Sequence, residues 1–212
     1  AAKEDAIAAR EVAEREAATS REIAGFMEDV LTSANPLESG EGADVTIEQV
    51  LDQSASLMQK GDRVSSPVVQ RTMLRVMADA YLGLGLAQKA RPLVERAKQL
   101  PDALASSDDG RFPCTGHGER LESARLAFSE AGVLRGLTRY EDAIARFKSL
   151  IEQCEEQDGV SDIAARAHNQ IADMYFWNLR QENRAYEHYA AAFERSGDGN
   201  DAERSTRIFA MT

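Results

Sequence analysis

Apolar residues recur along most of this chain at the spacing of one face of an α-helix. Ile23, Phe26, Met27, Val30 and Leu31 follow the i, i+3, i+4, i+7, i+8 pattern of a buried helical stripe. A second stripe follows over residues 47–58, and similar stripes continue to about residue 193. No window shows the sustained alternation of apolar and polar residues that indicates a β-strand. The pattern therefore predicts an all-α protein.

Breaker and cap residues divide the N-terminal part into two segments. Pro36 disfavours helical geometry in the residue ahead of it, so one long helix is predicted over residues 1–34. Its first half is charged and Ala-rich, and its second half is amphipathic. Thr46 and Gln49 have the spacing of a capping box, which predicts a short helix that Gly61 ends. Residues 35–66 are thus predicted to form a linker and a divergent capping helix.

The central part, residues 67–195, contains three similar segments. Ser66 and Pro67 predict the first helix start, with the Ser66 hydroxyl as the cap. Each segment then has a small residue in a first helix, a large apolar residue three positions later, and an Ala on a second helix. These positions are Ala78, Tyr81 and Ala90 in residues 74–97, Ala131, Leu134 and Ala143 in residues 127–150, and Ala172, Tyr175 and Ala185 in residues 168–193.

This arrangement resembles the tetratricopeptide repeat family. The resemblance implies a right-handed α-solenoid of antiparallel helical hairpins, a superhelix in which the small residues allow close helix approach. The third copy has one extra residue between Tyr175 and Ala185, and residues 101–118, rich in turn formers, are interpreted as an insertion loop. Residues 196–212 are interpreted as a C-terminal turn and the start of a capping helix.

The run from residue 10 to residue 36, REVAEREAATSREIAGFMEDVLTSANP, adds a second resemblance. With Phe26, Val30, Leu31 and Pro36 it looks like the region after the membrane span of bacterial transmembrane serine/threonine kinases that have tetratricopeptide tails. The chain also does not begin with Met. We therefore expect a fragment of a larger signalling protein, extracytoplasmic and membrane-anchored or, alternatively, cytoplasmic.

Charge narrows the classes of partner. The formal net charge is −11, which argues against nucleic acid, because phosphate binding depends on clustered Lys and Arg. It also disfavours an anionic membrane surface. No apolar stretch approaches the roughly 20 residues of a membrane span, so direct membrane insertion of this chain is not expected.

Motifs for catalysis, cofactors and metals are weak. The Leu82–Gly85 stretch lacks the strand and third glycine of a phosphate-binding loop. Cys114 and His117 are only half of a zinc site, and the Asp198 segment lacks the glycine and terminal Glu of a calcium loop. We expect no catalytic residues, no cofactor and no metal. Cys114 and Cys154 are the only cysteines, and their pairing stays open.

The resemblance also implies a concave groove lined by the first helix of each hairpin. Carried over residue by residue, it predicts a peptide-binding groove made of Arg75, Asp79, Leu82, Arg125, Phe128, Arg135, Arg166, Asn169, Asp173 and Phe176. Its four arginines favour an acidic protein or peptide partner, although arginine is common on any helix surface. The Lys/Asn pattern with which some family members hold a terminal carboxylate is not reproduced.

A non-catalytic scaffold or sensor module is therefore the leading functional hypothesis. Two alternatives are the sensory half of a transcriptional regulator and a self-association module that forms a homodimer through the N-terminal helix.

Overall fold

The computed structural model describes residues 46–59, 66–100, 112–113, 121–155 and 162–196, together with scattered helical residues between Arg10 and Glu28. Most of the predicted helix over 1–34 lies outside these ranges, as do the 35–45 linker, Gly61 and the C-terminal segment after residue 196. The described residues form an all-α fold, as predicted. None of their helices is both long enough and apolar enough to cross a bilayer.

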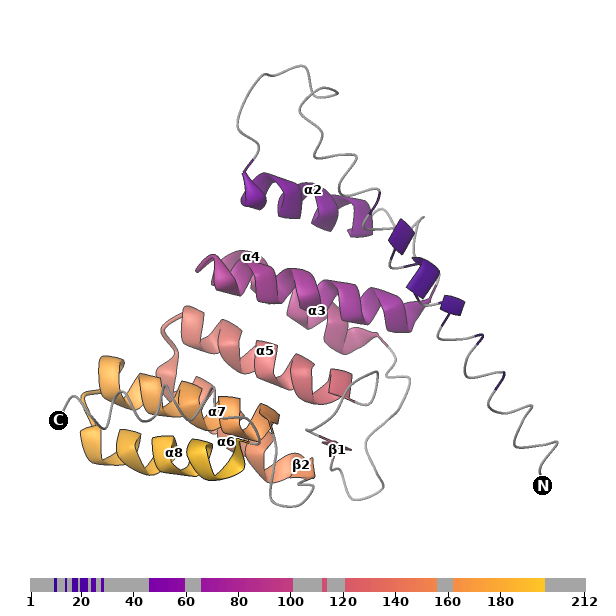
Figure 1. Cartoon of the computed structure of the whole chain (residues 1–212). Helices are drawn as coiled ribbons and strands as arrows, with labels where there is room; N and C mark the ends of the chain where they lie inside the picture. Colours follow the sequence, from indigo (N-terminus) through magenta and orange to yellow (C-terminus); the bar gives the residue numbers. More distant parts are fainter. Residues whose placement is uncertain are drawn as a thin grey trace, which may run out of the picture.

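The helices follow one another as packed pairs (Figure 1). Helix α2 (Ile47–Gln59) precedes the pair α3 (Pro67–Gly83) and α4 (Ala87–Gln99). The pair α5 (Glu122–Gly136) and α6 (Tyr140–Gln153) comes next, and then α7 (Asp162–Asp173), the π-helical turn η2 (Met174–Asn178) and α8 (Glu182–Arg195). Helix α4 also packs on α5 and α6 packs on α7, while α3, α5 and α7 touch in series.

Small residues lie where these helices meet. Ala78, Ala90, Ala131, Ala143 and Ala172 are all fully buried. Large side chains fill the space beside them, among which Tyr81, Phe147, Leu150 and Ile171 are the largest fully buried groups. The packing role predicted for the alanines is therefore confirmed, since a larger side chain at a close helix contact has no volume to occupy.

Two hydrophobic clusters divide this core. The first joins α3 and α4 with one face of α5, represented by Leu126 and Val133, and takes in partly buried residues of α2. The second joins the other face of α5, represented by Ala124 and Ala131, with α6, α7, η2 and α8. Helix α5 thus belongs to both clusters.

Each hairpin turn contains one residue in the left-handed region. These residues are Gly85 at φ 76°, Thr138 at φ 60° and Arg180 at φ 56°. Glycine adopts this geometry without the steric cost that a Cβ atom brings. Each turn closes with a backbone hydrogen bond: from Leu86 N to Tyr81 O at 2.8 Å, from Arg139 N to Leu134 O at 3.0 Å, and from Gln181 N to Tyr175 O at 2.8 Å.

The extra residue of the third hairpin lies in η2. Gly85 follows Tyr81 by four positions and Thr138 follows Leu134 by four, whereas Arg180 follows Tyr175 by five. A single inserted residue in a helix is commonly absorbed as one wide π turn. The π turn at Met174–Asn178 therefore accommodates the extra residue that the sequence shows between Tyr175 and Ala185.

Gly136 marks a close contact between the first two hairpins. A Cβ atom on Gly136 would lie 2.5 Å from the Cβ of Ala87, at the first residue of α4. Only glycine fits at this distance, because a Cβ there would overlap the neighbouring methyl group. The last residue of α5 can therefore reach the start of α4.

Helix α2 covers the open side of the first hairpin. Its predicted capping box is confirmed, with Thr46 N donating to Gln49 Oε1 at 2.8 Å and Gln49 N donating to the Thr46 hydroxyl at 3.2 Å. Lys89 on α4 reaches back to Glu48 and Asp52 of α2 at 2.7 and 2.8 Å.

The start of α3 differs in one respect from its prediction. Ser66 is the N-cap residue and Pro67 is the first helical residue, but the Ser66 hydroxyl makes no capping hydrogen bond. The prediction of a hydroxyl cap was therefore wrong. Proline at the first position leaves one fewer backbone N–H to satisfy, so the helix can begin without that cap.

Two very short parallel strands lie beside α5 and α6. Strand β1 (Phe112–Pro113), within the predicted insertion loop, pairs with β2 (Cys154–Glu155). Two residues are too few to leave an alternating pattern in the sequence. Cys154 is buried and disulfide-bonded, and Cys114, the only other cysteine of the chain, lies outside the described residues.

Candidate functional site

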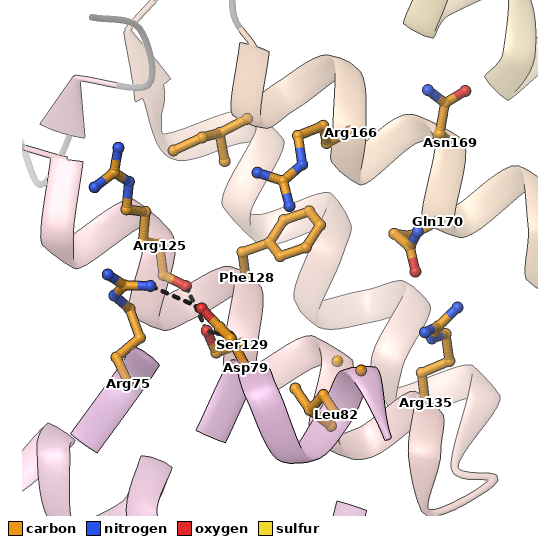
Figure 2. Close-up of a pocket in the computed structure, with 13 residues that line it drawn as sticks. Arg75, Asp79, Leu82, Arg125, Phe128, Ser129, Arg135, Arg166, Asn169 and Gln170 are labelled. Atoms are coloured by element: carbon orange, nitrogen blue, oxygen red, sulfur yellow. Dashed lines mark hydrogen bonds and ion pairs between the residues drawn. The ribbon is translucent and has the colours of Figure 1, made fainter. Parts of the chain in front are cut away.

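A cavity of about 540 Å³ lies between α3, α5 and α7 (Figure 2). Its size falls in the range of sites that bind small molecules or peptide side chains. Eight of the ten predicted groove residues line it: Arg75, Asp79, Leu82, Arg125, Phe128, Arg135, Arg166 and Asn169. The lining also includes Gly83, Ser129, Gly132, Ile163 and Gln170, which sequence reasoning did not name.

Arg75 is held by carboxylates of its own chain. Its Nε donates to Glu122 at 2.8 Å and one terminal nitrogen donates to the other oxygen of the same carboxylate at 3.2 Å. The second terminal nitrogen donates to Asp79 at 2.7 Å. Arg75 and Glu122 are only 8% and 6% exposed, so this pair is buried between α3 and α5. The guanidinium of Arg75 therefore has little capacity left for a ligand.

The same network fixes the neighbouring side chains. Burial alone would lower the pKa of Arg75, but the hydrogen bonds and charges of Glu122 and Asp79 raise it above its ordinary value. The hydroxyl of Ser129 donates to Asp79, and Arg125 lies 3.4 Å from Glu122. Figure 2 shows Arg75, Asp79, Ser129 and Arg125 gathered on one side of the cavity.

An aromatic ring and a guanidinium meet at the centre of the cavity. The guanidinium carbon of Arg166, on α7, lies 4.7 Å from the ring centre of Phe128, on α5 (Figure 2). This is cation–π distance, and it orients the planar donors of Arg166 without using them. Phe128 is itself fixed by edge-to-face packing on Phe147. Arg166 is exposed, so its N–H groups are open to a ligand.

A third group of donors lies on the opposite side. Arg135, Asn169 and Gln170 line the cavity there, away from Arg75 (Figure 2). Across the ranges that the structure describes, no hydrogen bond or ion pair joins Arg135 to another side chain. The two amide side chains can both donate and accept, as the backbone of an extended peptide requires.

Asp173 and Phe176 do not line this cavity. Asp173 accepts a hydrogen bond of 2.8 Å from the Tyr189 hydroxyl of α8, and Phe176 packs against the second core cluster. Both lie further along the α7–η2 segment than Asn169. The structure therefore brings together the first eight predicted residues and leaves these two beyond the end of the cavity.

The net charge of this cavity is opposite in sign to that of the whole chain. Among the described residues, four arginines line the cavity and two carboxylates offset them: Asp79, which also lines it, and Glu122, which pairs with Arg75. This leaves an excess of two positive charges. The chain as a whole has a net charge of −11. The cavity is thus a local positive site in an acidic protein, and it can attract and orient anionic groups.

The residues that sequence reasoning missed follow from simple helix geometry. Ser129 and Gly132 lie four and seven residues after Arg125 on α5, so they share its face. Gln170 lies four residues after Arg166 on α7 in the same way. Glu122 precedes Arg125 by three residues, but its pairing with Arg75 across 47 positions left no sequence signal.

A histidine pair lies outside this cavity, between α7 and α8. His168 Nδ1 and His188 Nδ1 are 2.9 Å apart, and Nε2 of His168 is buried without a partner among the described groups. Burial, His188 and Arg195 lower the pKa of His168 to about 4, and burial and Lys148 lower that of His188. Within the described ranges no group of three or more His, Cys, Asp or Glu side chains is placed to hold a metal ion.

The arrangement offers positive charge and hydrogen-bond donors. Comparison with known protein families, curated proteins and solved structures finds no match to this chain.

Proposed function

We propose that this chain is a tetratricopeptide-like, right-handed solenoid that binds an extended acidic segment of another protein in a groove formed by α3, α5 and α7. Three consecutive hairpins with buried alanines at equivalent positions support the repeat interpretation. Serial contact of α3, α5 and α7 supports a common inner surface. In this proposal the chain acts as a non-catalytic scaffold or sensor.

One observation carries the proposal: the cavity collects four arginines with an excess of two positive charges in a chain of net charge −11. Scattered surface arginines would be neutralised by nearby carboxylates, as Arg91 is by Glu95 on α4. Arg135 and Arg166 have no such carboxylate among the described residues. A guanidinium presents paired N–H groups that match a carboxylate, which favours glutamate- or aspartate-containing ligands.

The roles of the arginines differ in this proposal. Arg125, Arg135 and Arg166 contact the ligand, since their donors face the cavity. Arg75 positions α3 against α5 and holds Glu122, which in turn orients Arg125. Asn169 and Gln170 are placed to bond the backbone of the bound segment.

The test uses synthetic peptides that contain paired glutamates in a Gly/Ser background, measured by isothermal titration calorimetry. Reversing Arg125 and Arg135 to Glu should weaken binding by at least about a hundredfold, since each lost charge-assisted contact is worth roughly 1.5–3 kcal/mol. Binding should also lose part of its salt dependence.

Reversing Arg91 and Arg139 to Glu provides the matched control. Both are exposed arginines on or beside second helices, and the double change alters net charge by the same amount. If the two double variants weaken binding equally, the effect is one of overall charge and the groove is not the site.

A further inference from the structure

The chain's only tryptophan lies in the π turn at the end of α7. Trp177 is 60% exposed, which is unusual for so large an apolar side chain. Its ring packs edge-to-face on Phe176, with ring centres 4.7 Å apart. Phe176 in turn packs against the second core cluster. The indole of Trp177 therefore packs against Phe176 on one side, and most of its surface is exposed to solvent.

Trp177 continues the line of groove residues along α7. It lies seven positions after Gln170 and eleven after Arg166, a spacing that returns to the same side of an α-helix. The π turn at Met174–Asn178 rotates Trp177 from that side by only part of a turn. The equivalent position of the first hairpin, Gly83, comes two residues after Tyr81 and lines the cavity, as Trp177 comes two residues after Tyr175. In the second hairpin this position is Gly136, which meets Ala87 of α4 instead.

We propose that Trp177 is a second, apolar subsite for the same bound segment, and that it takes a large aliphatic or aromatic side chain. This inference rests on the proposed function, because the acidic part of the ligand must occupy the arginine cavity. Continuity with that cavity and the charge of its arginines identify the occupant: a peptide that has both an acidic residue and an apolar one. Burying an indole face against an apolar side chain adds stabilisation that the charged contacts do not supply.

Helix geometry sets the spacing that the ligand needs. Eleven residues of helix, from Arg166 to Trp177, span about 16 Å at roughly 1.5 Å per residue. An extended peptide advances by about 3.3 Å per residue. The apolar side chain should therefore lie about five residues from the acidic pair.

Unlabelled peptides of one length provide the test, each with a glutamate pair in a Gly/Ser background. One has no apolar residue, one has a leucine next to the pair, and two have a leucine about five residues from the pair, on either side. Trp177 emission reports contact directly, because no other tryptophan contributes. We expect a shift to shorter wavelength with one of the last two peptides only, and tighter binding of that peptide by calorimetry.

Variants separate this inference from the proposed function. Trp177→Ala should weaken the well-spaced leucine peptide by about tenfold and leave the peptide without leucine unchanged. Phe193→Ala, which removes another exposed aromatic side chain on α8, should change neither. If Trp177→Ala leaves all affinities unchanged, or lowers them all alike, the subsite is refuted, while loss of binding on reversal of Arg125 and Arg135 still upholds the groove. If that reversal has no effect, both proposals fail.

Discussion

Removal of the Glu122 carboxylate should destabilise the fold by more than the loss of an exposed ion pair would. Glu122 and Arg75 are both nearly inaccessible to water and share two hydrogen bonds, of 2.8 and 3.2 Å. Deleting one partner of such a pair typically costs about 3–5 kcal/mol, because the remaining charge stays buried. Asp79 still contacts Arg75 in the Glu122→Ala variant, so the lower end of the range, about 3 kcal/mol, is expected.

The assay is thermal unfolding followed by circular dichroism. In a chain of this length each kcal/mol lowers Tm by roughly 2–4 °C, so Glu122→Ala should lower it by about 6–12 °C. Glu95→Ala breaks an ion pair on α4 whose two side chains are 56% and 59% exposed. An exposed pair contributes less than about 1 kcal/mol, so this control should shift Tm by no more than roughly 4 °C.

A double variant tests the cause of the loss. Replacing the pair by apolar groups of similar size, Arg75→Met with Glu122→Leu, should recover most of the stability, because no buried charge then remains. Equal Tm values for Glu122→Ala and Glu95→Ala would refute the reasoning. A double variant that is less stable than Glu122→Ala would show that packing, and not the unpaired charge, explains the loss.

Three further predictions concern other parts of the fold. Gly136→Ala should destabilise the fold by about 1–3 kcal/mol, because the new Cβ overlaps Ala87 of α4. Gly83→Ala has open space around its Cβ and should change stability by less than about 1 kcal/mol. Urea unfolding measures both changes. The pKa of His168 is about 4 in the fold and near 6.5 when unfolded, so the unfolded chain binds the proton first. Stability should therefore fall by about 2.5 kcal/mol as pH decreases from 6.5 to 4, and His168→Phe should flatten that part of the profile. Cys154→Ser removes the disulfide of Cys154 and should cost about 2–4 kcal/mol. Wild-type protein in reductant should lose as much, and the variant should show no response to reductant.

Much of the fold could be predicted from local signals. Periodic apolar residues placed the helices, and the capping box at Thr46 and the extra residue after Tyr175 both correspond to observed features. These features depend on residues a few positions apart, which a single sequence displays directly. The β1–β2 pairing and the Gly136–Ala87 contact join residues far apart in sequence, so no local pattern indicated them.

The candidate site was predictable in outline only. Helix phase identified which side chains of α3, α5 and α7 share a surface, and eight of the ten residues do line one cavity. Their individual roles depended on partners that sequence does not reveal. Arg75 was predicted as a groove residue, yet its donors are taken by Glu122 and Asp79, while Arg135, predicted alongside it, faces the cavity with no such carboxylate among the described residues.

The division of the core into two clusters joined by α5 also affects how the molecule opens. A chain with two clusters and mainly nearest-neighbour contacts is expected to lose structure in parts. Amide hydrogens of α3–α4 and of α7–α8 should therefore exchange through separate local openings. The arginine cavity has walls from both parts, α3 on one side and α7 on the other. A segment bound across these walls disfavours opening on either side, and exchange in the two parts then slows together. Occupancy would thus turn two loosely linked units into one cooperative unit, without any change in the average positions of their helices.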